Sequence, residues 1–280
     1  MDHQLYLVAT PIGNLGDMSL RAIEILRSVD VIACEDTRHS GKLLKHFEIS
    51  KRLVSYHEHN KFEGADYLIE LMNGGKTVAL ITDAGTPGIS DPGEVLVRRC
   101  HEENIKVTSI PGPVAFVQAL VLSGFETTRF VFDGFLPTQN KEKQTYLGDL
   151  EKEQRTIILY EAPHRLVSTL TTLFKALGNR RVAVVKEITK KFERVYKASM
   201  EEAITYYEEN PPKGEYVLII EGKSKEAQLE EQMKIFETIS LEEHLTLYLK
   251  QGLTKKDAIK QIAQDRAMNK RDVYDYFKND

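Results

Sequence analysis

The 280-residue sequence has little cysteine and no long apolar run, and each of these features excludes a class of protein. Its two cysteines, Cys34 and Cys100, do not make the disulfide framework of a small secreted domain, so we expect both in a reduced core. No stretch approaches the roughly 18 apolar residues of a membrane span. No basic segment precedes the first apolar run, so we expect no signal peptide, no membrane partner and a cytoplasmic location.

Several common site motifs are also missing. No CxxC or HExxH pattern occurs, so we expect no metal site. The glycines after the first apolar run are spaced GxxG, which is not the dinucleotide fingerprint, and no P-loop pattern is present. A net charge of −4 argues against a generally basic nucleic-acid binder. A local basic stretch exists, because residues 250–278 hold eight Lys or Arg against four Asp.

The most informative stretch is the loop at residues 83–93, which follows a buried strand predicted at 78–81. Three glycines, two prolines and two aspartates fall within these eleven positions. Glycine lets a backbone approach a ligand closely, and proline fixes the shape of the approach. Because ligands in open α/β sheets bind at the carboxyl ends of strands, we interpret the segment as a ligand loop. The alternative is an elaborate turn into a helix that starts near Pro92.

Strands and helices alternate through the first half of the sequence, which favours a doubly wound, mostly parallel sheet. The nearly all-apolar helix predicted at 114–122 is expected to be buried on every side. Closely spaced strands around 182–197 indicate antiparallel pairing in a second sheet.

These patterns together predict an α/β protein with two α/β domains and a small helical C-terminal extension. The first domain is expected at residues 1–135 and the second at 136–222. Beyond Gly222 the pattern is helical, with an apolar repeat at Ala258, Ile262 and Ala263, so the extension is expected at 223–280.

Five segments in order resemble the ribosomal RNA small subunit methyltransferase I family of tetrapyrrole methylase-like (class III) methyltransferases. They are residues 7–15, 35–38, 83–93, 110–113 and 160–165. The resemblance covers about residues 5–222, and the C-terminal helices fit the family's extension. It implies a fold of the tetrapyrrole methylase type with S-adenosylmethionine bound in a cleft between the two domains. It also implies 2′-O-methylation of a cytidine ribose in the decoding region of 16S rRNA in the small ribosomal subunit, by a homodimer.

The resemblance also assigns donor binding to particular positions in the loops that follow the predicted strands. The expected donor-binding residues are Pro11, Asp83, Ala84, Gly85, Thr86, Ser90, Ala115, Ala162, Gly214 and Glu215.

The resemblance leaves the catalytic base open, so the charged residues at strand ends supply the candidates. A ribose hydroxyl needs its proton removed or its developing charge stabilised. The catalytic candidates are Glu161, His164, Lys186 and Glu187. The expected substrate-binding residues, which orient the RNA or hold its phosphates, are Asp36, Arg38, Arg165, Lys190 and Lys191. Helix capping is the structural alternative for the segment at 161–165.

Two other functions stay open at this point. A methyltransferase of the same fold that acts on a small precorrin-type tetrapyrrole would need no basic C-terminal extension. A non-catalytic module that binds the donor or a nucleotide would show no turnover. For the basic stretch at 250–278, RNA docking and a solvated helical face are equally favoured.

Overall fold

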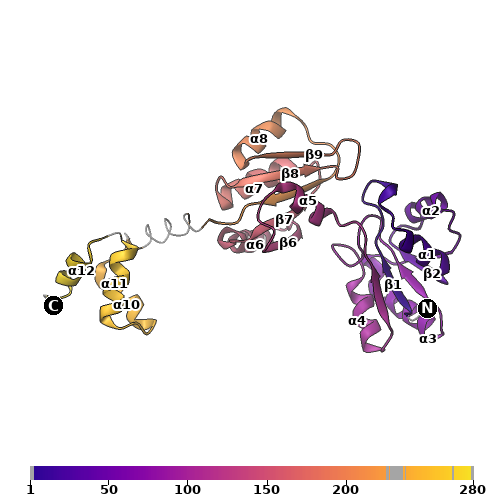
Figure 1. Cartoon of the computed structure of the whole chain (residues 1–280), viewed down its shortest axis with the longest axis horizontal. Coiled ribbons are helices and arrows are strands. Elements are labelled where there is room, and N and C mark those ends of the chain that lie inside the picture. Colours follow the sequence, from indigo (N-terminus) through magenta and orange to yellow (C-terminus); the bar gives the residue numbers. More distant parts are fainter. Residues whose placement is uncertain (1–2, 225–226, 228–235, 237, 267, 279–280) are drawn as a thin grey trace. The chain divides into compact units, whose positions relative to one another are not determined.

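The computed structural model describes residues 3–224, 227, 236, 238–266 and 268–278 (Figure 1). The rest of the predicted C-terminal extension lies outside the described residues. By internal packing the chain divides into two units. The first comprises Met1–Leu150 and Arg155–Glu221, and the second comprises Glu151–Gln154 and Gly222–Asp280.

The first unit contains two five-stranded sheets, and the N-terminal one is parallel throughout. Its strands lie in the order β3 (Arg52–Ser55), β2 (Val31–Cys34), β4 (Val78–Leu80), β1 (Leu5–Val8) and β5 (Val107–Ile110). The central strands are short apolar runs buried on both faces, as parallel strands covered by helices must be. The doubly wound parallel sheet is therefore confirmed.

Helices cover both faces of this sheet, and the alternation along β4 shows why. Ala79 packs in a cluster with residues of α1 (Leu20–Ser28) and α2 (Thr37–His46). Val78 and Leu80 point to the opposite face and pack with α3 (Lys61–Asn73) and α4 (Glu94–Glu102). Both cysteines are buried in these two cores, as predicted.

The second sheet is mixed. Its strands lie in the order β6 (Phe130–Phe135), β7 (Thr156–Glu161), β10 (Tyr216–Ile220), β8 (Arg181–Lys186) and β9 (Arg194–Ser199). Only β6 and β7 pair in parallel, and the other pairs are antiparallel. The predicted antiparallel pairing around 182–197 is the β8–β9 hairpin. One face packs against α6 (Asn140–Lys152), α7 (Leu166–Leu177) and α8 (Met200–Glu209).

Helix α5 (Ala115–Ser123) covers the other face of the second sheet, and it is only partly buried. Ala119 and Leu120 pack against strand residues, whereas Val117, Val121 and Leu122 are 38%, 64% and 39% exposed. The expectation that this helix is enclosed on every side is therefore wrong. The sheet packs against only one side of the helix. The residues on the other side are also apolar, so an apolar sequence did not indicate burial there. Gly124 ends the helix in a left-handed conformation, with φ of 65°.

The second unit contains the helices α10 (Leu241–Lys250), α11 (Lys255–Asp265) and α12 (Lys270–Tyr276). Ala258, Ile262 and Ala263 are buried, so the predicted apolar repeat is confirmed. Ile259, Ile262 and Val273 share a small core. In the part of the chain that the structure describes, no helix is both long and apolar enough to cross a lipid bilayer.

Candidate active site

Three loops at the carboxyl ends of β1, β4 and β5 are hydrogen-bonded to one another. Thr10 and Gly85 exchange two backbone bonds, with N···O distances of 2.8 and 3.1 Å. The Thr10 hydroxyl donates to Thr82 O at 3.0 Å, and the Thr86 hydroxyl donates to Pro113 O at 3.3 Å. These bonds join segments far apart in the sequence into one edge of the sheet. This edge is where ligands bind in open α/β folds.

Glycines allow this close approach at two positions. Gly85 has φ of 88°, in the region that favours glycine. A Cβ atom on Gly112 would lie 2.7 Å from Cβ of Ala9, so the loop after β5 packs against the end of β1 only because residue 112 has no side chain. The loop that the sequence singled out at 83–93 is thus held by its neighbours as well as by its own prolines.

A cavity of about 380 Å³ opens beside these loops, within the range of small-molecule sites. Its walls come from the three loops and from the strand ends of the second sheet. The lining residues are Ile12, Ala84, Gly85, Thr86, Ile89, Ser90, Asp91, Val114, Ala115, Phe135, Tyr160, Glu161, Ala162, Pro163, Ile188, Glu215, Tyr216 and Val217.

Most of the predicted donor-binding residues meet at this cavity. Those that line it are Ala84, Gly85, Thr86, Ser90, Ala115, Ala162 and Glu215. Pro11, Asp83 and Gly214 are each next in the chain to a lining residue but do not line the cavity themselves. Their part in donor binding stays a prediction.

Glu161, a catalytic candidate, lines the cavity but has protein partners for both carboxylate oxygens. Oε1 accepts from Ala162 N at 2.8 Å and lies 3.4 Å from Arg165 Nε, and Oε2 accepts from the Thr169 hydroxyl. Glu161 is 3% exposed. Arg165 also donates to Leu136 O at 2.8 Å. Both side chains therefore hold the start of α7 against the second sheet, and their catalytic and RNA-binding roles stay predictions.

The other catalytic candidates lie outside the cavity wall. His164 is exposed, and neither it nor Lys186 contributes to the lining. Glu187 lies beside the cavity, in a backbone conformation with φ of 50°. The sequence places all three at strand ends, but of the four catalytic candidates only Glu161 is among the residues that line the cavity.

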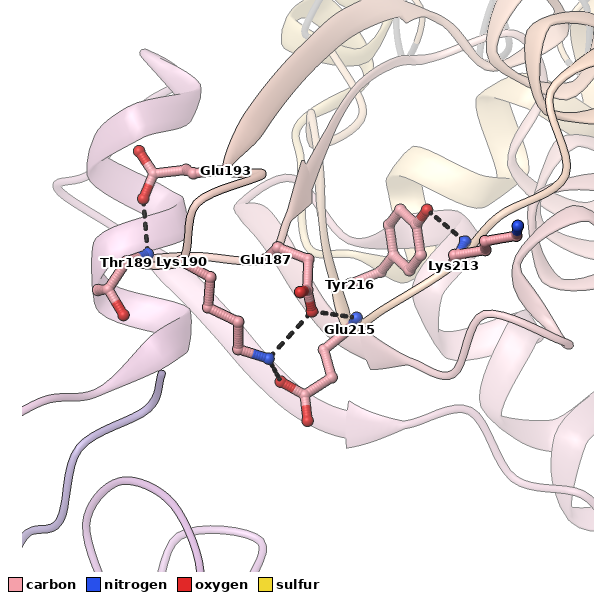
Figure 2. A network of polar contacts seen from close by, with 7 residues as sticks. All are labelled: Glu187, Thr189, Lys190, Glu193, Lys213, Glu215 and Tyr216. Carbon is pink, nitrogen blue, oxygen red and sulfur yellow. Dashed lines mark hydrogen bonds and ion pairs between the residues drawn. The ribbon is translucent and has the colours of Figure 1, made fainter. Parts of the chain in front are cut away.

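Lys190 and Glu187 belong to a network at the wall of the cavity (Figure 2). The Lys190 ammonium lies 3.0 Å from Glu187 Oε1 and 2.7 Å from Glu215 Oε2. Glu187 Oε1 also accepts from Glu215 N at 3.0 Å. Partial burial opposes the charged form of Lys190, but Glu215 and Glu187 outweigh it and raise the pKa of the ammonium. Partial burial likewise opposes the charge on Glu187, yet Lys190 and Glu215 N keep the pKa of that carboxyl below its ordinary value.

This network fixes the turn that carries Ile188 into the cavity wall. Glu187 and Thr189, on either side of Ile188, both have positive φ, 50° and 66°. Thr189 N donates to Glu193 Oε2 at 2.7 Å, which holds the second half of the turn (Figure 2). Strained backbone of this kind persists where surrounding contacts determine it, and it clusters at functional sites.

The remaining predicted substrate residues lie on the surface. The Asp36 carboxylate begins α2 by accepting from Arg38 N and His39 N, and these bonds lower its pKa. The Arg38 side chain is 90% exposed, with its guanidinium 3.4 Å from Asp36. Lys191 is exposed beside Phe192, itself 68% exposed. Both Arg38 and Lys191 are exposed enough to meet a large anionic partner.

A group of acids lies at the carboxyl ends of β2 and β4. Burial raises the pKa of Asp91 to about 6, with Glu35 and Asp83 adding to the rise and the Thr82 hydroxyl opposing it. Burial also raises the pKa of Glu35, again with Asp83 adding. Asp91 lines the cavity, and sequence reasoning did not single it out as a site residue. The sequence feature that could have pointed to Asp91 is its position inside the 83–93 loop.

The lining suits an amphipathic organic cation. Apolar side chains such as Ile89, Val114 and Ile188 form much of the wall, and the carboxyl groups of Asp91, Glu161 and Glu215 are also there. An apolar wall suits an aromatic base, and carboxylates suit ammonium and sulfonium groups. Among the described residues, no group of three or more His, Cys, Asp or Glu is placed to hold a metal ion.

Comparison with known proteins decides the family. The family model described as Tetrapyrrole (Corrin/Porphyrin) Methylases matches residues 4–204. A Synechocystis sp. protein named Ribosomal RNA small subunit methyltransferase I is 48% identical over 271 residues, covering 96% of this chain and 95% of that protein. A Bacillus subtilis protein of the same name is 46% identical over 273 residues, covering 98% and 93%. The chain belongs to the ribosomal RNA small subunit methyltransferase I family, within the tetrapyrrole methylases.

Solved structures agree on the fold of this family member. Diphthine synthase aligns with a TM-score of 0.61 at 15% identity, covering 79% of this chain and 90% of that one. A cobalt precorrin-4 methyltransferase of cobalamin biosynthesis aligns with a TM-score of 0.56 at 18% identity, covering 78% and 94%. Such low identities establish a common fold only. The expected tetrapyrrole methylase type of α/β fold and the expected family are confirmed.

Proposed function

We propose that this chain transfers a methyl group from S-adenosylmethionine to ribosomal RNA of the small subunit. The proposed target is the ribose 2′-hydroxyl of a cytidine in the decoding region of 16S rRNA. The observation that carries this proposal is the similarity along nearly the whole chain to proteins that bear the name of that rRNA methyltransferase. The cavity supports it, because its lining suits the donor's apolar and cationic parts.

The donor is proposed to lie against the loops that follow β1, β4 and β5 and against the strand ends of the second sheet. Backbone groups of the loops would contact its adenosine, and nearby carboxylates would attract its positive charges. The proposed donor-binding residues are Pro11, Asp83, Ala84, Gly85, Thr86, Ser90, Ala115, Ala162, Gly214 and Glu215.

The donor supplies an already activated methyl group, so the protein's main task is positioning. Loops locked by the Thr10–Gly85 and Thr86–Pro113 bonds are suited to that task, because near-attack geometry supplies much of the rate in such displacements. The apolar wall also excludes water from the reacting groups.

The RNA is proposed to bind through the exposed cations near the cavity. Arg38 and Lys191 are the strongest candidates, because their charges face solvent. Asp36, Arg165 and Lys190 have partners within the protein, so we propose that they position the neighbouring segments from which RNA is contacted. The basic stretch at 250–278 would add further phosphate contacts.

We also propose a homodimer that works in the cytoplasm, where small subunits are assembled. The exposed apolar side chains of α5, Val117, Val121 and Leu122, support dimer formation because a second copy would cover them.

The proposed function is tested with small subunits from cells that lack this enzyme. Purified protein and methyl-labelled S-adenosylmethionine should place label on 16S rRNA, and mapping of alkali-resistant linkages should find it at one cytidine ribose. Subunits from normal cells, already methylated, should accept little label. Label on a base, on another RNA or on a tetrapyrrole instead would overturn the proposal.

A further inference from the structure

We propose that Asp91 is the proton acceptor for the ribose hydroxyl during methyl transfer. This inference rests on the function proposed above and names a residue in the same cavity.

Three carboxyl groups line the cavity as the structure describes it: Asp91, Glu161 and Glu215. Glu161 is 3% exposed and bonded through both oxygens, with Arg165 alongside. Glu215 is paired with the Lys190 ammonium at 2.7 Å, so its carboxylate already has a partner in the protein. No cation lies within ion-pair distance of Asp91 in the described part of the chain, so its electron pair is the most available of the three.

The other ionisable groups of the wall cannot accept a proton near neutral pH. They are Tyr160 and Tyr216, and burial raises the pKa of each phenol above its usual range, with Asp91 adding to the rise at Tyr160. Both therefore stay protonated. The same interaction shows that Asp91, on the β4 loop, and Tyr160, on β7, are electrostatically coupled.

The surroundings of Asp91 make it a better base than an ordinary carboxylate. Burial and the negative charges of Glu35 and Asp83 raise the pKa of Asp91 to about 6, while the Thr82 hydroxyl limits the rise. A general base works best when its pKa lies near the working pH. The charges of Asp83, His57 and Asp36 act in turn on Glu35, so they influence Asp91 through that carboxyl group.

In the proposed step the hydroxyl proton passes to the Asp91 carboxylate as the ribose oxygen attacks the methyl carbon. The new O–CH₃ bond forms while the C–S bond breaks. The electron pair of the C–S bond remains on sulfur, which leaves a neutral thioether. Asp91 later releases its proton to water, so the step needs no other reactant.

The test compares D91N, D91E and wild type in single-turnover methyl transfer at saturating donor, from pH 5 to 8.5. The wild-type rate should rise about tenfold per pH unit while Asp91 is protonated, and it should level off at about pH 6 or below, because the donor's positive charge favours the carboxylate. D91N should lose about 10²–10⁴-fold in rate and this pH dependence. D91E, which restores a carboxylate, should recover part of the rate together with a pH-dependent profile.

The matched control is E94Q, which neutralises an exposed carboxyl three positions along the chain and outside the cavity wall. It should keep the wild-type rate and profile. Donor affinity measured by calorimetry should stay at the wild-type value in E94Q and should fall much less than the rate in D91N. Asp91 is one of three carboxyl groups that attract the donor's positive charge, whereas its loss as a proton acceptor acts on the rate alone.

Two results would overturn the assignment of Asp91 while leaving the proposed function intact. One is a D91N variant with the wild-type rate and pH profile. The other is a loss of donor affinity that matches the loss of rate, which would make Asp91 a binding residue. If wild type and E94Q bind the donor but transfer no methyl group to small subunits, the proposed function fails and the assignment fails with it.

Discussion

A Cβ atom at Gly214 would lie 2.6 Å from Oε1 of Glu187. That oxygen accepts from Glu215 N and from the Lys190 ammonium, so it cannot move without breaking the network that shapes the cavity wall. Gly214 also has φ of 93°, which side chains disfavour. One missing side chain therefore lets the β8–β9 turn and the start of β10 meet.

We expect G214A to disturb both stability and donor binding. The clash and the backbone strain should lower the free energy of unfolding by on the order of 2 kcal/mol. Displacement of Glu215 and Ile188 should weaken donor affinity in calorimetry. G178A is the control, since Gly178 has φ of 77° but no atom within 4 Å of an added Cβ. Equal donor affinity in G214A and wild type would show that the network has no part in shaping the site.

We expect G85V to abolish donor binding. Gly85 lines the cavity with φ of 88°, a conformation that a β-branched residue adopts at a cost of about 1–3 kcal/mol. The valine methyl groups would also extend into the space around the loop. G75V carries similar strain, with φ of 81°, in a turn where nothing lies within 4 Å of an added Cβ. Both variants should lose stability in denaturant titrations, and only G85V should lose the donor in calorimetry.

We expect R38A to weaken RNA methylation and to spare donor affinity. The Arg38 side chain is 90% exposed, and the residue does not line the cavity. Loss of a phosphate contact should raise the apparent KM for small subunits on the order of tenfold and should flatten the salt dependence. R98A, which removes another exposed arginine, serves as the comparison. A parallel fall in donor affinity would reassign Arg38 to the donor site.

Asp91 should make stability depend on pH in an identifiable direction. Its folded pKa of about 6 lies above the value near 3.9 for an unfolded aspartate, so the folded chain keeps a proton that the unfolded chain has lost. Stability from this group therefore falls as the pH rises from about 4 to 6, then levels off.

The D91N variant removes that pH-dependent loss of stability. At pH 7.5 its free energy of unfolding should exceed the wild-type value by on the order of 2 kcal/mol, and at pH 4 the two should agree. Urea titrations at the two pH values measure the difference. A variant less stable than wild type at pH 7.5 would mean that the carboxylate is stabilised in the fold, contrary to the raised pKa.

The sequence predicts the sheets and the loops well because those depend on local pattern. Short apolar runs between glycine and proline turns identify buried parallel strands. The loop at 83–93 could be recognised as a ligand loop because it holds more glycines and prolines than are needed to connect a strand to a helix.

The roles of individual charges are harder to predict, because they depend on partners that the sequence does not place. Glu161 ends β7 and Lys190 follows β8, yet one is bonded to Thr169 and the other to Glu187 and Glu215. No pattern within the 83–93 loop marks Asp91 as reactive, and its raised pKa arises from burial, from Glu35 after β2 and from Asp83 in the same loop. The sequence pattern therefore identifies the ligand loop, whereas the tertiary contacts determine which of its side chains can act as a base.

Deletion of residues 223–280 should separate donor binding from RNA methylation. The cavity is lined only by residues of the first unit, whose two sheets have their own cores. The deleted segment contains the basic stretch at 250–278, with eight Lys or Arg against four Asp. The shortened protein should bind S-adenosylmethionine with unchanged affinity in calorimetry.

Methylation of small subunits by the shortened protein should fall at least tenfold, because phosphate contacts supply much of the affinity for RNA. The control neutralises only the charge, by changing Lys255, Lys256 and Lys260 to Gln in the full chain; it should reproduce part of the loss and reduce the salt dependence. Full methylation by the shortened protein would show that the basic stretch is a solvated helical face. Loss of donor binding as well would show that the first unit needs the second for its own stability.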